Sequence, residues 1–261
     1  MPLQATVNKT DVATAFSRSA TTYDAAADLQ RQIADKLLGY IPSREYSKVV
    51  DVGCGTGYST QLLSNNISVE SLVGLDIAEG MVSYARQKSR ASFCCADAEQ
   101  LPFRNQCIDL LFSSLALQWC PTLSAVLDEA GRVLTPKGRY IFSTLGPGTL
   151  FELQTAWKAV DKYVHVNYFA GSALIEQLAQ KSGFRVQIHQ QTVVRQYHHL
   201  NELMSELKCL GVNNINTGRP TGLTGRQRLL SLRQHYEQFR NSENLLPASY
   251  LVYFVILEKD S

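Results

Sequence analysis

Apolar positions follow two different periods along this chain. In residues 21–40, Ala26, Leu29, Ile33 and Leu37 recur at spacings of three and four, which predicts an amphipathic helix. Short, nearly continuous apolar runs follow, and helix-like stretches separate most of them. The runs predicted to be strands are 48–55, 71–77, 91–98, 107–117 and 138–145. Apolar strands that alternate with helices predict a doubly wound α/β fold, with a parallel sheet covered on both faces.

The regular alternation loosens after residue 145. Helical patterns occupy 172–184, 201–211 and 225–239, and strands are predicted at 185–197 and 249–259, giving a mostly parallel sheet of seven strands. The excursion from about 198 to 247 is interpreted as a helical lid. We expect one domain over 1–261, made of a helical cap (1–45), a core (46–146) and a substrate-side half (147–261).

Composition narrows the possible classes of protein. With 261 residues, 45% of them apolar, the chain is long enough to bury a full core. It has no apolar run of about 18 residues and no apolar leader, so we expect a cytoplasmic protein that does not enter a membrane. Five of the six cysteines lie in or beside apolar runs without zinc-ligand spacing, which predicts reduced, buried thiols and no metal site. The pI of about 8.2 and the lack of a recognised motif argue against nucleic-acid binding.

The stretch VVDVGCGTGYS, residues 49–59, is a candidate ligand loop. It lacks the lysine of a nucleoside triphosphate loop, and Gly53, Gly55 and Gly57 read GxGxG where a dinucleotide fingerprint reads GxGxxG. Asp51, inside the predicted strand, would repel a pyrophosphate. An acid there suits a ligand with an ammonium group and no phosphate, such as S-adenosylmethionine (SAM).

Further candidates follow the next predicted strands. Asp76, nineteen residues beyond Gly57, is placed to accept hydrogen bonds from ribose hydroxyls, a role common to nicotinamide and SAM sites. Asp97 and Ala98 end the third strand, where a carboxylate would meet an exocyclic adenine amine. All of these positions are at the carboxyl ends of parallel strands, where ligands bind in such sheets.

At this point the sequence resembles the class I SAM-dependent methyltransferases. The segments VVDVGCGTG, LVGLDIAEGMV, CCADAEQLPF, IDLLFSSLALQW and LTPKGRYIFST occur in that family's order over residues 48–144. The resemblance implies SAM as cofactor, with S-adenosylhomocysteine as product. The residues it implies around SAM are Asp51, Gly53, Gly55, Gly57, Asp76, Ile77, Met81, Asp97, Ala98 and Ser113.

The flanking segments resemble a narrower family, the malonyl-[acyl-carrier protein] O-methyltransferases of biotin synthesis. The resemblance rests on AFSRSATTYDAAADLQ (15–30), STLGPGTLFEL (143–153), HVNYF (165–169) and LKCLGVNNINTGRPTGLTGR (207–226). It implies methylation of the free carboxylate of a malonyl thioester held by an acyl carrier protein. It also implies catalytic roles for Tyr23, Phe169 and Arg226. Arg226 is expected to be buried against the carboxylate, and an exposed docking role is its alternative. Tyr23, Trp119, Tyr168 and Phe169 are candidates for an aromatic lid, and plain core packing explains each of them equally well.

Basic residues concentrate late in the chain. Residues 181–240 hold nine lysines and arginines against three acids, and Arg219, Arg226, Arg228 and Arg233 belong to this excess. A solvated helix face is one explanation. The other is a dock for an acidic carrier protein, for which Arg228 and Arg233 are the candidates.

Two alternatives stay open from the sequence. A methyltransferase of a free small acid or quinone precursor would share the cofactor loop. A protein that binds SAM for regulation and transfers nothing would share it too.

Overall fold

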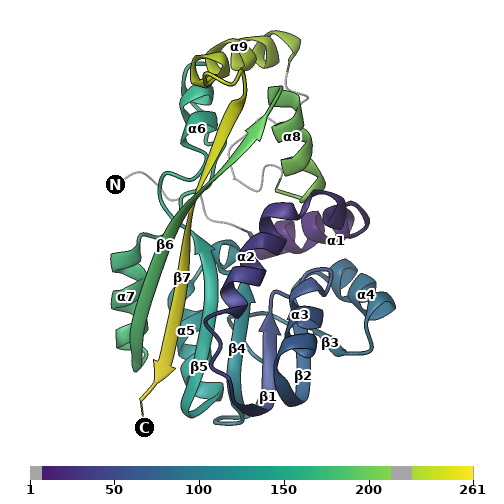
Figure 1. The fold of residues 1–261 in the computed structure, drawn as a ribbon, viewed down its shortest axis with the longest axis vertical. Coiled ribbons are helices and arrows are strands. Elements are labelled where there is room, and N and C mark those ends of the chain that lie inside the picture. The colour runs from purple at the N-terminus through teal and green to yellow at the C-terminus, as the bar shows by residue number, and fades with distance from the viewer. Residues whose placement is uncertain (1–7, 213–224, 261) are drawn as a thin grey trace.

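The computed structural model describes residues 8–212 and 225–260 and builds one open sheet with helices on both sides (Figure 1). The strands are β1 Glu45–Val52, β2 Ser68–Asp76, β3 Ser92–Cys95, β4 Ile108–Ser114, β5 Leu134–Leu145, β6 Phe184–Tyr197 and β7 Leu246–Lys259. The α-helices are α1 Lys9–Ala26, α2 Asp28–Leu38, α3 Tyr58–Asn66, α4 Glu79–Lys88, α5 Leu123–Val133, α6 Phe151–Lys158, α7 Ser172–Lys181, α8 Leu200–Cys209 and α9 Arg226–Tyr236, with 3-10 turns η1 Leu117–Trp119 and η2 Glu237–Phe239. Within this part of the chain, no helix has the length and apolar character that a membrane crossing requires.

The sheet has seven strands in the order β3-β2-β1-β4-β5-β7-β6. The pairings from β3 through to β5 are parallel, and β7 is antiparallel to both β5 and β6. The strand order reverses between β1 and β4, so a crevice opens there at the carboxyl ends of the strands. The predicted doubly wound, mostly parallel sheet is confirmed.

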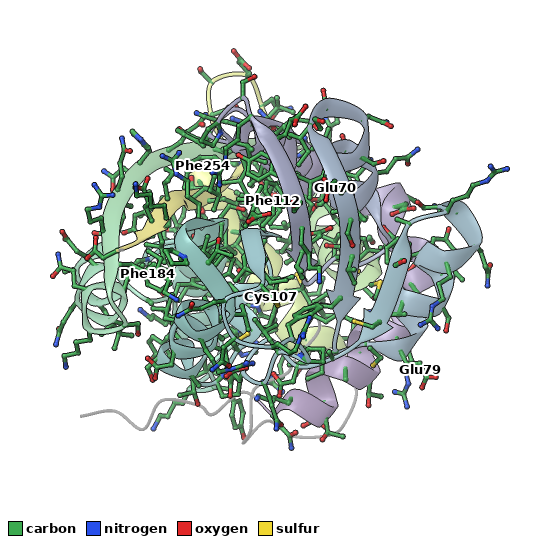
Figure 2. The ribbon with its side chains drawn as sticks, turned by 90° about the horizontal axis from the view of Figure 1, so that it is seen from below. Glu70, Glu79, Cys107, Phe112, Phe184 and Phe254 are labelled. Atoms are coloured by element: carbon green, nitrogen blue, oxygen red, sulfur yellow. The ribbon has the colours of Figure 1, made fainter. Side chains whose placement is uncertain are left out.

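Each central strand contributes to two cores because alternate side chains point to opposite faces of the sheet. Phe112 of β4 packs with residues of α2 and α3 on one face, and its neighbour Leu111 packs with residues of α5 and α7 on the other. Figure 2 shows Phe112 and Phe254 among the strands, whereas Glu79 lies at the outside. Burial on both faces explains why these strands are continuous apolar runs in the sequence.

The strands β6 and β7 reach beyond the rest of the sheet. They pair along fourteen residues each, from Phe184 opposite Lys259 to Tyr197 opposite Leu246. Figure 1 shows α6, α8 and α9 gathered at their far end. Buried side chains from all three helices, such as Tyr236 of α9, join the core on the α2 face. Two of these helices, α8 and α9, fall in the excursion predicted at about 198 to 247, whereas α6 precedes it in the sequence.

The prediction of a single helix over 21–40 is wrong at its start. The chain forms α1 from Lys9 and then breaks at Ala27 before α2 begins. Asn8 caps α1 by accepting a hydrogen bond from the Thr10 N–H at 2.9 Å. Because α1 packs mainly on α4 and α8, it lacks the broad apolar stripe that marks α2 in the sequence.

Candidate active site

A cavity opens at the carboxyl ends of β1, β2 and β4, and we name it the strand-end cavity. The turn after β1 forms part of its wall, and α1 contributes Val12, Phe16 and Tyr23. Its other lining residues are Lys9, Val52, Gly53, Gly55, Leu75, Asp76, Ile77, Met81, Ala96, Asp97, Ala98, Ser114, Leu115, Ala116, Leu117, Trp119 and Cys120. The cavity therefore lies at the edge where open α/β sheets bind their ligands.

The glycine turn between β1 and α3 brings the backbone to the wall of this cavity. Gly53, Gly55 and Gly57 have φ angles of 73°, 53° and 90°, in the region that favours glycine. A Cβ on Gly53 would lie 2.2 Å from the Cβ of Ala116, and one on Gly57 would lie 3.3 Å from Phe93. A Cβ on Gly55 would meet nothing within 4 Å. Gly53 and Gly57 therefore permit close packing, whereas Gly55 leaves space open beside the cavity.

Asp76 ends β2 and lines the same cavity. Its Oδ2 accepts a hydrogen bond from the Gly55 N–H at 2.9 Å, and its Oδ1 accepts one from the Ala78 N–H at 2.8 Å. Burial raises the pKa of Asp76, and backbone hydrogen bonds partly oppose that rise. Since each carboxylate oxygen has a second lone pair, Asp76 is placed to accept hydrogen bonds from ligand hydroxyls.

A charge cluster joins α1 to the far side of the cavity. Lys9 Nζ lies 2.6 Å from both Asp97 Oδ2 and Glu99 Oε2. Asp97 Oδ1 also accepts a hydrogen bond from the Glu99 N–H at 2.9 Å. Among the described residues lining the cavity, Lys9 is the only cation, and these two acids neutralise it. The cavity thus offers no free positive charge that a pyrophosphate would require.

A second cavity, here named the adjoining cavity, shares a wall with the first. Phe16, Tyr23, Leu115 and Trp119 line both cavities. The adjoining cavity is otherwise lined by Leu29, Gln30, Gln118, Leu145, Leu150, Leu153, His165, Val166, Asn167, Phe169, Leu207, Leu210, Val212 and Tyr250. Its lining is largely apolar, with a few polar groups from distant parts of the sequence, an arrangement typical of small-molecule sites.

His165 brings a titratable group to the adjoining cavity. Its side chain is 2% exposed, its ring stacks on Trp157 with centroids 3.6 Å apart, and its Nε2 lies 2.7 Å from Asp161 Oδ1. Asp161 also forms an ion pair with Arg228 of α9. Burial opposes ionisation of Asp161, but hydrogen bonds from Arg228 and His165 outweigh it and lower its pKa. Asp161 and the stacked Trp157 therefore fix the orientation of the imidazole at the wall of this cavity.

Comparison with known proteins places this chain in a family. Residues 50–142 match the methyltransferase domain family. The malonyl-[acyl-carrier protein] O-methyltransferase of Hahella chejuensis is 38% identical over 94% of this chain and 89% of its own length. The chain belongs to the malonyl-[acyl-carrier protein] O-methyltransferase family. The biotin biosynthesis bifunctional protein BioHC of Cellvibrio japonicus is 44% identical over 98% of this chain. The BioHC protein of Saccharophagus degradans is 43% identical over 97% of this chain. The chain spans about half the length of these two bifunctional relatives, 51% of the first and 47% of the second.

Solved structures agree with this family at the level of the fold. The YcgJ protein of Bacillus subtilis superimposes with a TM-score of 0.65, covering 88% of this chain and 99% of its own, at 17% sequence identity. Together with the sheet order, this similarity confirms the predicted class I methyltransferase fold.

The strand-end cavity fits SAM. It combines carboxylates for hydroxyl and amino groups with an open backbone at Gly55, and its described lining residues include no unpaired cation for a phosphate. Seven of the ten residues predicted from the sequence to surround SAM line this cavity: Gly53, Gly55, Asp76, Ile77, Met81, Asp97 and Ala98. Their individual contacts with SAM stay predictions.

The other three predicted residues do not line the cavity. Asp51 is fully buried and accepts a hydrogen bond from Thr60 Oγ1 at 2.6 Å. Gly57 is the N-cap residue of α3 and packs against Ala85 and Phe93, away from the cavity. Ser113 is also fully buried, and the next residue, Ser114, lines the cavity in its place. Because side chains alternate along β4, an offset of one residue selects the opposite face.

The three predicted catalytic residues have different surroundings. Tyr23 lines both cavities, and Phe169 lines the adjoining one. Arg226 begins α9 with an exposed side chain and lines neither cavity. The expectation that it is buried is wrong, and its exposure agrees with the alternative of a docking residue, which stays a prediction. Arg219 and residues 213–224 as a whole, which include much of the segment 207–226, lie outside the described residues.

The two predicted docking arginines also differ from each other. Arg228 is half-buried, paired with Asp161 and placed over the ring of Tyr163 at 5.7 Å, so it belongs to the His165 cluster. Arg233 is exposed and donates a hydrogen bond to Asn201 Oδ1 at 2.8 Å. Of this pair, Arg233 alone has the surroundings expected of a surface contact.

Sequence reasoning missed several polar residues of these cavities. Gln30 lines the adjoining cavity, and its Oε1 is buried without a hydrogen-bond partner. Lys9 reaches across the strand-end cavity from a helix that the sequence pattern did not indicate. His165 pairs with Asp161 in the loop after α6, and no periodic pattern in this stretch indicates that the pair is buried.

Proposed function

We propose that this chain transfers the methyl group of SAM to the free carboxylate of a malonyl thioester carried by an acyl carrier protein. The observation that carries the proposal is the shared wall of Tyr23 and Trp119, which joins a cavity fitting SAM to a second, largely apolar cavity. His165 lines this second cavity and pairs with Asp161 behind it. The names of full-length relatives support malonyl-[acyl-carrier protein] as the acceptor. The name of the bifunctional relatives supports biotin synthesis as the fate of the ester.

The proposed reaction requires no general base. A malonyl carboxylate, with a pKa near 4, is already ionised at pH 7 and can attack directly. When bound, SAM supplies an electrophilic methyl group on a positively charged sulfur. Since the opposite charges of the reactants cancel as the bond forms, the main tasks of the protein are alignment and exclusion of water.

The adjoining cavity has the means for both tasks. Its apolar walls, among them Leu29, Leu150 and Val166, exclude water from the carboxylate. We assign His165 to positioning the carboxylate, because its imidazole lines this cavity and is held in place by Asp161 and by stacking on Trp157. Tyr23, at the boundary, is placed to orient both reactants. This assignment gives His165 the role that the sequence had suggested for Arg226.

The exposed arginines of α9 support a docking surface for the carrier. Arg226 and Arg233 are both exposed on this helix. Carrier proteins are acidic, so positive side chains there would speed association and favour the correct partner. The six cysteines are all unpaired, and we place the reaction in the reducing cytoplasm.

Mass spectrometry of malonyl-carrier protein after incubation with SAM tests the proposal. A gain of one methyl group is expected, and alkaline hydrolysis of the product should release that methyl as methanol because it forms an ester. Methylation of free malonate or a quinone precursor in place of the thioester would favour the rival enzyme. Tight SAM binding without methylation of any acceptor would favour a regulatory SAM-binding protein.

A further inference from the structure

A third cavity lies beyond the adjoining cavity, between the start of α5, the loop 167–171 and α7. Its volume is about 430 Å³, against about 90 Å³ for each of the other two. Gln118, Asn167 and Phe169 line both this cavity and the adjoining one. We name it the outer groove, and its shared wall makes it a route from the surface toward the acceptor carboxylate.

The chemistry of the outer groove is unlike that of the basic surface of α9. Its lining residues are Leu117, Gln118, Cys120, Pro121, Thr122, Leu123, Ser124, Phe142, Thr144, Asn167, Tyr168, Phe169, Ala170, Gly171, Leu174, Ile175 and Leu178. None of these described residues carries a charge. A groove of this kind does not select a phosphate or a free acid, but it suits a chain of methylene and amide groups.

Two features suit such a chain in particular. Tyr168 and Leu174 are 56% and 45% exposed, so the groove has large apolar side chains open to solvent. Exposed apolar patches often mark binding sites. Farther in, Gln118 and Asn167 offer side-chain amides at the wall shared with the adjoining cavity. The groove therefore combines apolar contact outside with amide groups inside.

We propose that the outer groove binds the long, uncharged, amide-bearing arm through which the malonyl group is attached as a thioester. This inference rests on the proposed function. The malonyl end passes Phe169 into the adjoining cavity while the arm stays in the groove. The groove then distinguishes a thioester acceptor from free malonate, which has no arm to bind.

The test compares three acceptors: malonyl-carrier protein, malonyl-coenzyme A, and a malonyl thioester truncated to a methylthio group. The variant Leu174→Glu places a charge in the groove. Its control, Gln177→Glu, adds the same charge to an exposed position of α7 that does not line the groove. The control thus accounts for general repulsion of acidic substrates.

With Leu174→Glu, KM should rise about tenfold for both long-arm acceptors and stay unchanged for the truncated one. Gln177→Glu should match the wild type on all three. Equal effects of the two substitutions, or an equal loss on the truncated thioester, would overturn the inference and leave the proposed function standing. A second variant, Ser124→Trp, should block the groove with the same selectivity. If the wild type methylates none of the three acceptors, the proposed function fails and the inference fails with it.

Discussion

The strand-end cavity and the adjoining cavity are built in different ways. The first takes most of its lining from the ends of successive strands and the turns after them, at residues 52–55, 75–81, 96–98 and 114–120. The second collects side chains from α2, η1, α6, α8, β7 and the loop before α7. Local sequence segments supply the lining of the first cavity, whereas tertiary packing assembles the lining of the second. The comparison teaches that substitutions in the first should affect SAM binding itself, whereas substitutions in the second should affect use of the acceptor.

The largest expected effect is in the strand-end cavity. Gly55→Val should abolish SAM binding, because the side chain would fill the open space beside the cavity. Gly183→Val is the matched control, since Gly183 has φ +82°, is equally open and lies far from the cavity at the end of α7. Both variants carry the strain of a branched residue at positive φ, about 1–2 kcal/mol. Calorimetry should detect SAM binding in the control only, and normal affinity in folded Gly55→Val would contradict the placement.

The next largest effect is expected at Asp76, and it tests whether this residue binds SAM directly or only supports the backbone. Asp76→Ala should weaken SAM binding by a few kcal/mol, because the ribose loses a charge-assisted acceptor. Asp109→Ala is the control. Asp109 also accepts two backbone hydrogen bonds, from the N–H groups of Ser47 and Lys48 at 2.8 and 2.9 Å, but it lies near the amino ends of β4 and β1, away from the cavity. Both variants should unfold more easily. A similar loss of SAM affinity in both would remove Asp76 from direct contact.

These two cavities also show how far the sequence alone reaches. The strand-end residues were found because a parallel sheet places consecutive strand ends at one edge, so motif order becomes spatial order. Within that region, errors came from side-chain direction, as with Ser113, where the next residue lines the cavity. The adjoining cavity was largely missed. No local pattern indicates that Gln30, His165 and Tyr250 line the same cavity, because only the packing of α2, the 160–169 loop and β7 brings them to it.

The buried carboxyl group of Asp51 should make the stability of the protein depend on pH. Burial, reinforced by the charge of Asp76, raises the pKa of Asp51 to about 7, although a hydrogen bond from Thr60 opposes the rise. In the unfolded chain this group has a pKa near 3.9, so between about pH 4 and 7 the folded state binds more protons. The free energy of unfolding should therefore fall as pH rises through this window, by a few kcal/mol from this residue. Urea titrations should show a flatter pH dependence for Asp51→Asn.

In the adjoining cavity, His165→Gln should lower kcat/KM for every malonyl acceptor by about 10- to 100-fold while leaving SAM affinity unchanged. The reason is loss of the imidazole that Asp161 orients beside the acceptor. Asp161→Asn should act in the same direction with a smaller effect, because the ring remains. Calorimetry measures the affinity for SAM, and initial rates with malonyl-carrier protein measure the use of the acceptor. A fall in SAM affinity with either variant would erase the proposed division between the cavities.

The smallest expected effects concern the arginines of α9, and they divide by burial. Arg226 and Arg233 are exposed, so their contacts with an acidic carrier are screened by salt. Replacing either with alanine should raise KM for malonyl-carrier protein a few-fold at low ionic strength, with less effect at high ionic strength and little on a truncated malonyl thioester.

Arg228 is half-buried and paired with Asp161. Arg228→Ala should lower turnover on all malonyl thioesters with little dependence on salt, because it disturbs the support of His165. Identical salt dependence for all three variants would place them on one solvated face and remove Arg228 from the adjoining cavity's support.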